Sequence, residues 1–146
     1  MDEFLHCVGW KSQPELPELY AMADVLVVPT IAQEGLSRTA VEAMASGCPV
    51  INTWIPHSGV PWVSLHEETG LTVPVDDPVA LADAANRLLA EPGLRDRLAA
   101  AARERAVRVF DHRVMAERTL RLYHRVLADP GRAGETGRAV MVPSLP

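Results

Sequence analysis

The order of apolar and polar residues predicts a strand, a helix and a second strand between residues 23 and 53. An unbroken apolar run at residues 25–28 is typical of a strand buried on both faces of a parallel sheet, and Pro29 ends it. Apolar side chains with helical spacing follow, at Leu36, Ala40, Ala43 and Met44. Gly47 supplies a left-handed helix stop, and a new apolar run begins at Val50. These three elements predict one βαβ unit.

The same alternation continues on both sides of this unit. Residues 4–10 are predicted to form a strand that ends at Gly9, and residues 14–23 a helix with Ser12 as its cap. Residues 69–74 are predicted to form a further short strand. Strands that alternate with helices imply a parallel sheet with helices on its faces. The fold class expected from this pattern is α/β, with a partial Rossmann-like sheet and flanking helices.

An irregular stretch at residues 54–68 separates two of these strands. It contains two prolines, one glycine and the tryptophans Trp54 and Trp62. A connection of about fifteen residues without secondary structure is usually functional or mobile. Two interpretations of the tryptophans stay open, because they could pack the loop or contact a ligand.

The last part of the domain is predicted to be helical. Asp77 caps one helix, with Pro78 at its first position. Its buried stripe is expected to consist of Leu81, Ala85, Leu88 and Leu89. A second helix is expected over residues 94–109, and its inward side chains are Leu94, Leu98, Ala101 and Ala102. These C-terminal helices are expected to follow the sheet directly.

A third helix and a tail complete the expected organisation. Asp111 caps the helix, and its apolar face consists of Leu120, Tyr123 and Leu127. Residues 129–146 show no periodicity and are predicted to be a disordered tail. Residues 1–128 are therefore expected to form a single domain.

Composition and charge exclude several classes of protein. The chain has 146 residues, of which 48% are hydrophobic and 23% charged, as in globular domains. A net charge of −5 argues against a nucleic-acid-binding surface, and acidic residues separate the arginines of the late helices, which indicates a solvated face. No apolar run reaches the length of about 18 residues that a bilayer requires, and no signal-peptide core is present. The expected location is the cytoplasm.

Cysteine and histidine spacing gives no indication of a metal site or a disulfide framework. Cys7 and Cys48 both lie within or beside apolar runs, and we expect both thiols to be buried and structural. The five histidines show no metal-ligand spacing. We expect neither a metal ion nor a cofactor.

The segment between the first strand and the helix of the βαβ unit contains the candidate site. Open α/β sheets bind ligands beyond the carboxyl ends of their strands, where residues 30–37 lie. Backbone N–H groups at the start of the helix form a natural seat for phosphate, and the residues concerned are Gly35, Leu36, Ser37, Arg38 and Thr39. Glu34 could accept hydrogen bonds from sugar hydroxyls or stabilise a positively charged transition state. Glu42, about two turns into the helix, could bind a diol such as a ribose.

The run E-G-L-S-R-T-A-V-E-A-M-A-S-G-C-P-V-I resembles the E-x7-E signature of retaining glycosyltransferases with the GT-B fold. This is the glycosyl transferases group 1, or family 4, type, which includes glycogen synthase, sucrose synthase and mannosyltransferases. Glu34 and Glu42 have the seven intervening residues of that signature. The likeness extends over roughly residues 4–128, through E-L-P-E-L-Y-A-M-A-D-V-L-V-V-P-T and T-G-L-T-V-P-V-D-D-P-V-A-L-A.

The resemblance implies a nucleotide-sugar donor, UDP- or GDP-linked, bound in a C-terminal donor domain. Glu34 would contact the donor sugar as the catalytic residue, either as nucleophile or as electrostatic stabiliser. The amides of residues 35–39 would hold sugar hydroxyls and the diphosphate, and Glu42 would bind the ribose. The reaction would transfer a hexose, with retention of the anomeric configuration, to a glycan or lipid acceptor, as in polysaccharide biosynthesis.

This chain departs from the family pattern in two respects. Leu36-Ser37 replaces the common Phe-Gly, and Arg38 replaces an aliphatic residue, so Arg38 could add a phosphate contact. The family's N-terminal Rossmann half and the Arg/Lys pair for the diphosphate lie outside this sequence. We therefore expect a fragment with an exposed sheet edge, with little or no activity alone, whose membrane association would be peripheral and through the other half.

Other functions fit parts of the same pattern. The chain could be a non-catalytic, truncated module that binds a nucleotide sugar without turnover. It could also be a sugar-nucleotide epimerase or a phosphorylase, which share the architecture. A flavodoxin-like regulator is disfavoured, because no acidic phosphoacceptor cluster ends the first strand.

Overall fold

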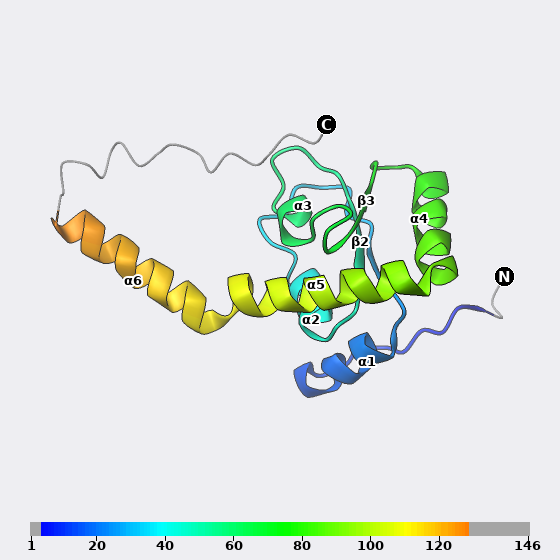
Figure 1. Ribbon diagram of the computed structural model, residues 1–146, viewed down its shortest axis with the longest axis horizontal. Helices are drawn as coiled ribbons and strands as arrows, with labels where there is room; N and C mark the ends of the chain where they lie inside the picture. Colours follow the sequence, from blue (N-terminus) through cyan, green and yellow to red (C-terminus); the bar gives the residue numbers. More distant parts are fainter. Residues whose placement is uncertain (1–3, 129–146) are drawn as a thin grey trace.

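The computed structural model describes residues 4–128 and has an α/β fold built on a small parallel sheet (Figure 1). Three strands, β1 (Leu26–Val28), β2 (Val50–Thr53) and β3 (Gly70–Val73), lie side by side in that order. Both strand pairs are parallel, with Ile51 opposite Val27 on one side and Leu71 on the other. The predicted fold class and βαβ unit are confirmed.

Two hydrophobic cores lie on opposite faces of the central strand β2. Alternate residues of a strand point to opposite faces, so Val50 belongs to one core and Ile51 to the other. The helix α2 (Arg38–Ala45) packs on the Val50 side, and α4 (Pro78–Ala90) packs on the Ile51 side. All four residues of β2 are buried, because it has a strand on each side and helices over both faces.

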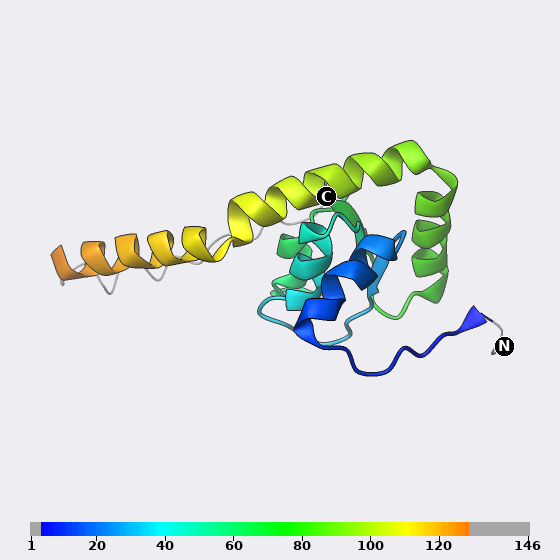
Figure 2. The same ribbon diagram turned by 90° about the horizontal axis from the view of Figure 1, so that it is seen from below.

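The long helix α5 (Pro92–Phe110) joins the two cores. Its residue Leu98 packs with the Ile51 core, whereas Ala102 and Ala106 pack with the Val50 core. In Figure 2 it extends from the end of α4 across the body of the domain. The predicted inward positions Leu98 and Ala102 are fully buried.

Helices α2 and α4 lie close to their predicted positions. The side chain of Ser37 caps α2, whose buried face is formed by Ala40, Ala43 and Met44, and Gly47 follows with a φ of 82°. Asp77 caps α4 by accepting a hydrogen bond from the N–H of Ala80 at 2.9 Å. Leu36 was expected on the α2 stripe but precedes the helix, and its side chain is exposed.

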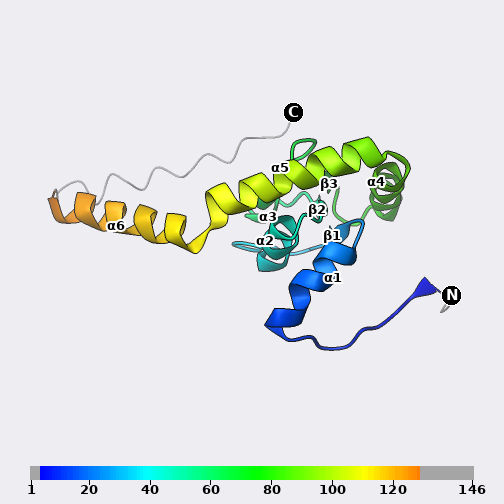
Figure 3. The same cartoon turned by 60° about the horizontal axis from the view of Figure 1, so that its bottom comes forward.

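A short 3-10 turn, Gln13–Glu15, precedes α1 (Leu16–Met22), so the helix predicted over residues 14–23 is confirmed. The N–H and hydroxyl of Ser12 both donate to the carboxylate of Glu15, at 2.9 and 2.6 Å. Figure 3 shows α1 beside α2 and close to β1. The helix α1 thereby lies beside α2 on the side of Glu42.

The prediction of a strand at residues 4–10 is wrong. These residues are exposed, and the exposed fractions of Phe4 and Trp10 are 91% and 88%. Cys7, expected to be a buried thiol, is exposed as well, whereas Cys48 is buried. An apolar run gains ladder hydrogen bonds only against another strand, and within residues 4–128 no strand lies beside this segment.

The edge position of β1 also corrects its expected burial. Val27 is 36% exposed, although the sequence predicted a strand buried on both faces. Among the described residues β1 has β2 as its one neighbour, so its other edge is open. Burial on both faces requires covering helices and flanking strands, which the apolar run itself cannot supply.

Three further differences concern the second half of the domain. The stretch predicted to be irregular contains a short helix, α3 (Val60–Val63). Leu89 was placed in the buried stripe of α4 but is 52% exposed. The helix α6 (His112–Ala128) extends away from the rest of the domain in Figures 1 and 2, so its predicted apolar face is exposed.

Two remaining expectations concern the ends of the chain and the membrane. The predicted tail at 129–146, and residues 1–3 of the predicted domain, lie outside the described residues. In the part that the structure describes, each helix is too short or too polar to cross a bilayer.

Candidate functional site

The first turn of α2 presents a row of backbone donors. Ser37 is 4% exposed, and its hydroxyl oxygen accepts a hydrogen bond from the N–H of Ala40 at 3.4 Å. Within residues 4–128 no protein acceptor lies in hydrogen-bond range of five other N–H groups, those of Gly35, Leu36, Ser37, Arg38 and Thr39. A helix N-terminus bears roughly half a positive charge, and free N–H groups there suit a phosphate. The predicted anion-binding residues therefore lie together in space as well as in sequence.

Glu34 combines a fixed main chain with an exposed side chain. Its N–H donates to the hydroxyl oxygen of Ser58 at 3.2 Å, and its carbonyl oxygen accepts from that hydroxyl at 3.1 Å and from the N–H of Gly59 at 2.8 Å. The hydroxyl of Thr30 donates to its carboxylate at 3.3 Å. The carboxylate is thus available to a ligand while its backbone is held at three points.

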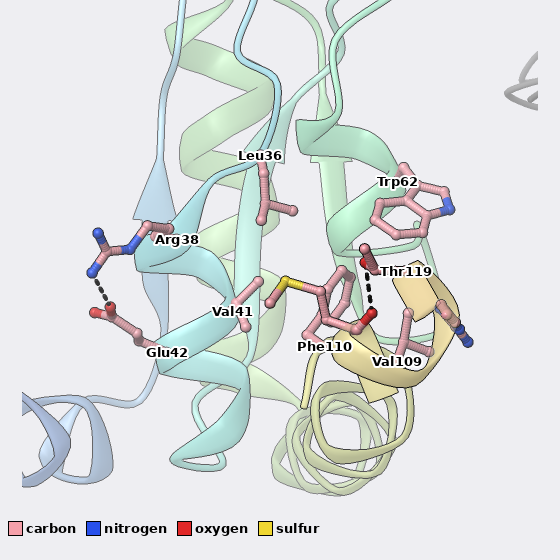
Figure 4. A pocket seen from close by; sticks show the side chains of 10 residues that line it. Leu36, Arg38, Val41, Glu42, Trp62, Val109, Phe110 and Thr119 are labelled. Carbon is pink, nitrogen blue, oxygen red and sulfur yellow. Dashed lines mark hydrogen bonds and ion pairs between the residues drawn. The ribbon is translucent and has the colours of Figure 1, made fainter. Parts of the chain in front are cut away.

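Glu42 lies on the side of α2 that faces α1. The hydroxyl of Tyr20 donates to its Oε2 atom at 3.3 Å. The Nη2 atom of Arg38 lies 3.6 Å from its Oε1 atom, and Figure 4 marks this ion pair. The side chain of Glu42 is 31% exposed, so the carboxylate remains accessible to a ligand. Burial, and next the negative charge of Glu42, raise the pKa of the Tyr20 hydroxyl above its ordinary value.

The two acidic residues of the predicted pair have different protein partners. Glu34 is bonded to the segment around Ser58, whereas Glu42 is bonded to α1 through Tyr20. The amides of residues 35–39 lie between them along the chain. The structure therefore places one carboxylate just before the free N–H groups of residues 35–39 and the other beyond the first turn of the helix.

An open groove of about 440 Å³ borders α2 on the side of Val41. Trp62 from α3, Phe110 from α5 and Thr119 from α6 line it together with residues of α2 (Figure 4). The rings of Trp62 and Phe110 meet edge to face, with centroids 5.1 Å apart and an angle of 82° between their planes. This contact supports the packing interpretation of Trp62, and its exposed fraction of 37% also leaves part of the ring free for a ligand.

A second groove, of about 310 Å³, lies at the carboxyl ends of all three strands on the α4 side. Its polar side chains include Asp76 and Asp77, and the carboxylate of Asp77 already caps α4. The carboxylate of Asp77 already occupies the N-terminus of α4, whereas, within residues 4–128, the first turn of α2 has five free N–H groups. The α2 side of the sheet is the better anion site.

Sequence reasoning missed Ser58 and Gly59. A Cβ atom built on Gly59 would lie 1.9 Å from the carbonyl oxygen of Gly35, so the main chains of the two loops are in direct contact. One sequence signal was present, since a Ser-Gly pair follows β2 and the carboxyl ends of adjacent parallel strands meet at one edge. That signal does not specify which loop residues touch.

Arg105 corrects the prediction that the arginines of the late helices form only a solvated face. It is half-buried, and its Nε and Nη2 atoms donate to the carbonyl oxygens of Val63 and Trp62 at 3.0 and 2.6 Å. Its guanidinium also lies 5.5 Å from the centre of the Trp62 ring. Burial lowers the pKa of Arg105. Arg105 therefore binds the carbonyl groups at the C-terminal end of α3 and holds Trp62 in the wall of the groove.

Among residues 4–128, no group of three or more histidine, cysteine, aspartate or glutamate side chains is placed to hold a metal ion. The chemistry that the described site offers is hydrogen bonding, helix-terminus electrostatics and two carboxylates.

Comparison with known protein families gives a match over most of the chain. The family model described as "Glycosyl transferases group 1" matches residues 3–105. The D-inositol 3-phosphate glycosyltransferase of Nocardioides sp. is 37% identical over 118 residues, which are 81% of this chain and 25% of that protein. The phosphatidyl-myo-inositol mannosyltransferase of Mycobacterium leprae is 40% identical over 104 residues, 71% of this chain and 27% of that protein. The chain thus spans about a quarter of the length of these relatives.

Solved structures match the fold over a similar region. The sucrose-phosphate synthase of Thermosynechococcus elongatus aligns with a TM-score of 0.75 and 37% identity, covering 83% of this chain and 30% of that one. The C-terminal domain of a glycosyl transferase group 1 family protein from Francisella tularensis aligns with a TM-score of 0.63 and 27% identity, covering 72% of this chain and 53% of that one.

Proposed function

Since this chain belongs to the glycosyl transferases group 1 family, we propose that it is the donor-binding part of a retaining glycosyltransferase. The donor is a UDP- or GDP-linked hexose, and the acceptor is a glycan or a lipid. The free N–H groups of residues 35–39 at the start of α2 are called the anion seat. The observation that supports this proposal most directly is this anion seat, with Glu34 before it and Glu42 after it along the chain.

Each part of the donor has a matching group in the site. The free N–H groups of residues 35–39 bind the diphosphate and sugar hydroxyls, because they combine hydrogen-bond donors with the positive end of the helix. Glu42 accepts hydrogen bonds from the ribose hydroxyls, a role that its half-exposed carboxylate allows. Glu34 contacts the donor sugar.

The exposed carboxylate of Glu34 can serve retention in two ways. It can attack the anomeric carbon as a nucleophile, forming a glycosyl–enzyme bond as the nucleotide leaves, and the acceptor hydroxyl then displaces Glu34 in a second step. It can instead stabilise the positive charge of the transition state while the acceptor hydroxyl attacks on the face from which the nucleotide leaves. Both roles require a carboxylate at a fixed position, and the three hydrogen bonds to the main chain of Glu34 provide it.

The names of relatives support the proposed acceptor class. One of them acts, by name, on phosphatidyl-myo-inositol, which is a lipid, and another on D-inositol 3-phosphate, which offers the same kind of hydroxyl acceptor without a lipid chain. We propose a hydroxyl-bearing glycan or lipid acceptor on this basis, a cytoplasmic location, and peripheral membrane contact through the part of the relatives that this chain does not span. A polypeptide of these 146 residues is proposed to bind donor with little or no turnover.

The proposal is tested by calorimetry and saturation-transfer NMR with UDP-glucose, UDP-N-acetylglucosamine and GDP-mannose. We expect saturable binding of at least one donor, and about tenfold or weaker affinity in Glu42→Gln, since a hydrogen bond to a charged group is worth about 1.5–3 kcal/mol. Glu117→Gln is the matched control, because Glu117 also pairs with an arginine one turn away, on the exposed helix α6. Absence of binding to all three donors, or equal binding by the Glu42 variant, would contradict the proposal.

A further inference from the structure

The loop that follows β2 holds the main chain of Glu34 in place. Resting on the proposed function, we infer that Ser58 and Gly59 are positioning residues, which fix Glu34 and Gly35 for the donor sugar. Neither residue is expected to touch the donor itself. Their effect is on where the carboxylate of Glu34 and the first free N–H groups of the anion seat lie.

Ser58 is bonded to both polar groups of the Glu34 main chain. Its hydroxyl accepts from the N–H of Glu34 at 3.2 Å and donates to the carbonyl oxygen of Glu34 at 3.1 Å. Ser58 is 2% exposed, so water does not compete for these bonds. A buried hydroxyl that donates and accepts on the same residue fixes that residue in two directions.

Gly59 holds the next peptide by contact. Its N–H donates to the carbonyl oxygen of Glu34 at 2.8 Å. An added Cβ would lie 1.9 Å from the Gly35 carbonyl oxygen and 2.8 Å from the Gly35 carbonyl carbon, both main-chain atoms that cannot rotate away. The φ of Gly59 is −77°, which any residue adopts, so glycine is required here for the close approach and not for its conformational freedom.

A third contact continues the pairing of the two loops. The side-chain amide of Gln33 donates to the carbonyl oxygen of Pro56 at 3.0 Å. Each of residues 33–35 is therefore bonded to or in contact with a residue of the 56–59 segment. Because β1 and β2 are adjacent and parallel, their following loops meet at one edge, and the β2 loop becomes the support of the sugar-binding loop.

The inference predicts separate effects on the sugar and nucleotide parts of the donor. Ser58→Ala removes both hydrogen bonds to Glu34 with little change of volume, together with the bond that the hydroxyl accepts from the N–H of Val60 at 3.3 Å. Gly59→Ala forces the loops apart. We expect each variant to bind UDP-glucose or GDP-mannose about five- to tenfold more weakly, and UDP or GDP within about twofold of the unaltered chain. Nucleotide affinity stays within this range because Gly35 supplies only one of the five free N–H groups, and neither Ser58 nor Gly59 is bonded to residues 36–39 or to Glu42.

The test combines these titrations with amide hydrogen exchange by NMR on the full chain. Exchange of the Glu34 N–H should become at least about fivefold faster in Ser58→Ala, since its acceptor is lost. Ser64→Ala is the serine control, because Ser64 is as buried as Ser58 and its hydroxyl has no hydrogen-bond partner within residues 4–128. Gly93→Ala is the glycine control, because a Cβ there meets no atom within 4 Å. Thermal unfolding of every variant shows whether it is folded.

The outcomes separate this inference from the proposed function. Unchanged Glu34 exchange in Ser58→Ala, or equal weakening of sugar nucleotide and bare nucleotide in both variants, overturns the positioning role. If the unaltered chain binds none of the four ligands, the proposed function fails, while the exchange measurement still decides whether Ser58 holds Glu34. Selective loss of sugar-nucleotide affinity with faster Glu34 exchange supports the inference.

Discussion

The Nη2 atom of Arg38 lies 3.6 Å from the Oε1 atom of Glu42, four residues further along α2. The arginine side chain is 76% exposed, whereas Glu42 is also bonded to Tyr20. An exposed ion pair of this kind contributes little to stability. Arg38 is therefore free to turn from Glu42 toward an anion at the helix N-terminus, whereas Glu42 keeps its position.

Removing Arg38 should weaken donor binding. We expect Arg38→Ala to lower the affinity for UDP- or GDP-sugars by about 0.5–1.5 kcal/mol, roughly two- to tenfold, through loss of a charge-assisted phosphate contact. Calorimetry at two salt concentrations measures this, and the difference should shrink at high salt. Arg121→Ala, which breaks a similar exposed pair with Glu117, is the control. Unchanged affinity in Arg38→Ala would show that Arg38 makes no donor contact.

Tyr20 should make stability fall at alkaline pH. Burial and Glu42 raise its pKa above 10.0, so the folded state holds the phenol proton more tightly than the unfolded state does. This contribution is fully present below the unfolded pKa of about 10 and is lost as the pH rises through the higher folded pKa. Between about pH 9 and 11, denaturant unfolding should show a smaller decrease in the free energy of unfolding for Tyr20→Phe than for the unaltered chain. Tyr123→Phe, at an exposed position on α6, should behave as the unaltered chain.

Two leucine substitutions should differ in their effect on folding. Leu98 on α5 is fully buried among Ile51, Leu71 and Leu88, so Leu98→Ala should lower the free energy of unfolding by about 2–5 kcal/mol. Leu120 on α6 is 56% exposed, and Leu120→Ala should change it by less than about 0.5 kcal/mol. Urea unfolding of both variants checks this difference. A large loss in Leu120→Ala would mean that the apolar face of α6 is packed after all.

Arg105 should matter more for stability than Arg103, which is exposed on the same helix. Arg105→Met leaves the carbonyl oxygens of Trp62 and Val63 without their donor and should cost about 1–3 kcal/mol of unfolding free energy. Tryptophan fluorescence should also change, because the guanidinium lies over the Trp62 ring. Arg103→Met, at an exposed position on the same helix, is the matched control. Equal stability of the two variants would refute a structural role for Arg105.

Local rules identified most of the elements and the family. The stripe of Ala40, Ala43 and Met44, the Gly47 stop and the Asp77 cap are decided within one or two helical turns, and the structure confirms them. The resemblance to group 1 glycosyltransferases is confirmed at the level of the family. The roles of Glu34, Glu42 and residues 35–39, and the domain limits, stay predictions.

Local rules failed where burial depends on distant neighbours. Residues 4–10 have the apolar content of a strand, but within residues 4–128 they have no strand to pair with, so Phe4 and Cys7 are exposed. The same reason explains why Leu89 and the apolar face of α6 are exposed. The prediction for Arg105 was wrong in the opposite sense, since the local pattern predicted an exposed side chain. The side chain is half-buried because it donates to carbonyl oxygens of α3, a different element.

The sequence by itself determined the βαβ unit and the spacing of Glu34 and Glu42, because one continuous strand-loop-helix segment sets both. Only the tertiary structure decided what holds Glu34. Ser58 and Gly59 are 24 residues or more away along the chain, and they meet Glu34 and Gly35 because β1 and β2 pair in parallel. Periodicity reports which face of an element is apolar, whereas contact between two loops depends on strand order and on the absence of a single Cβ.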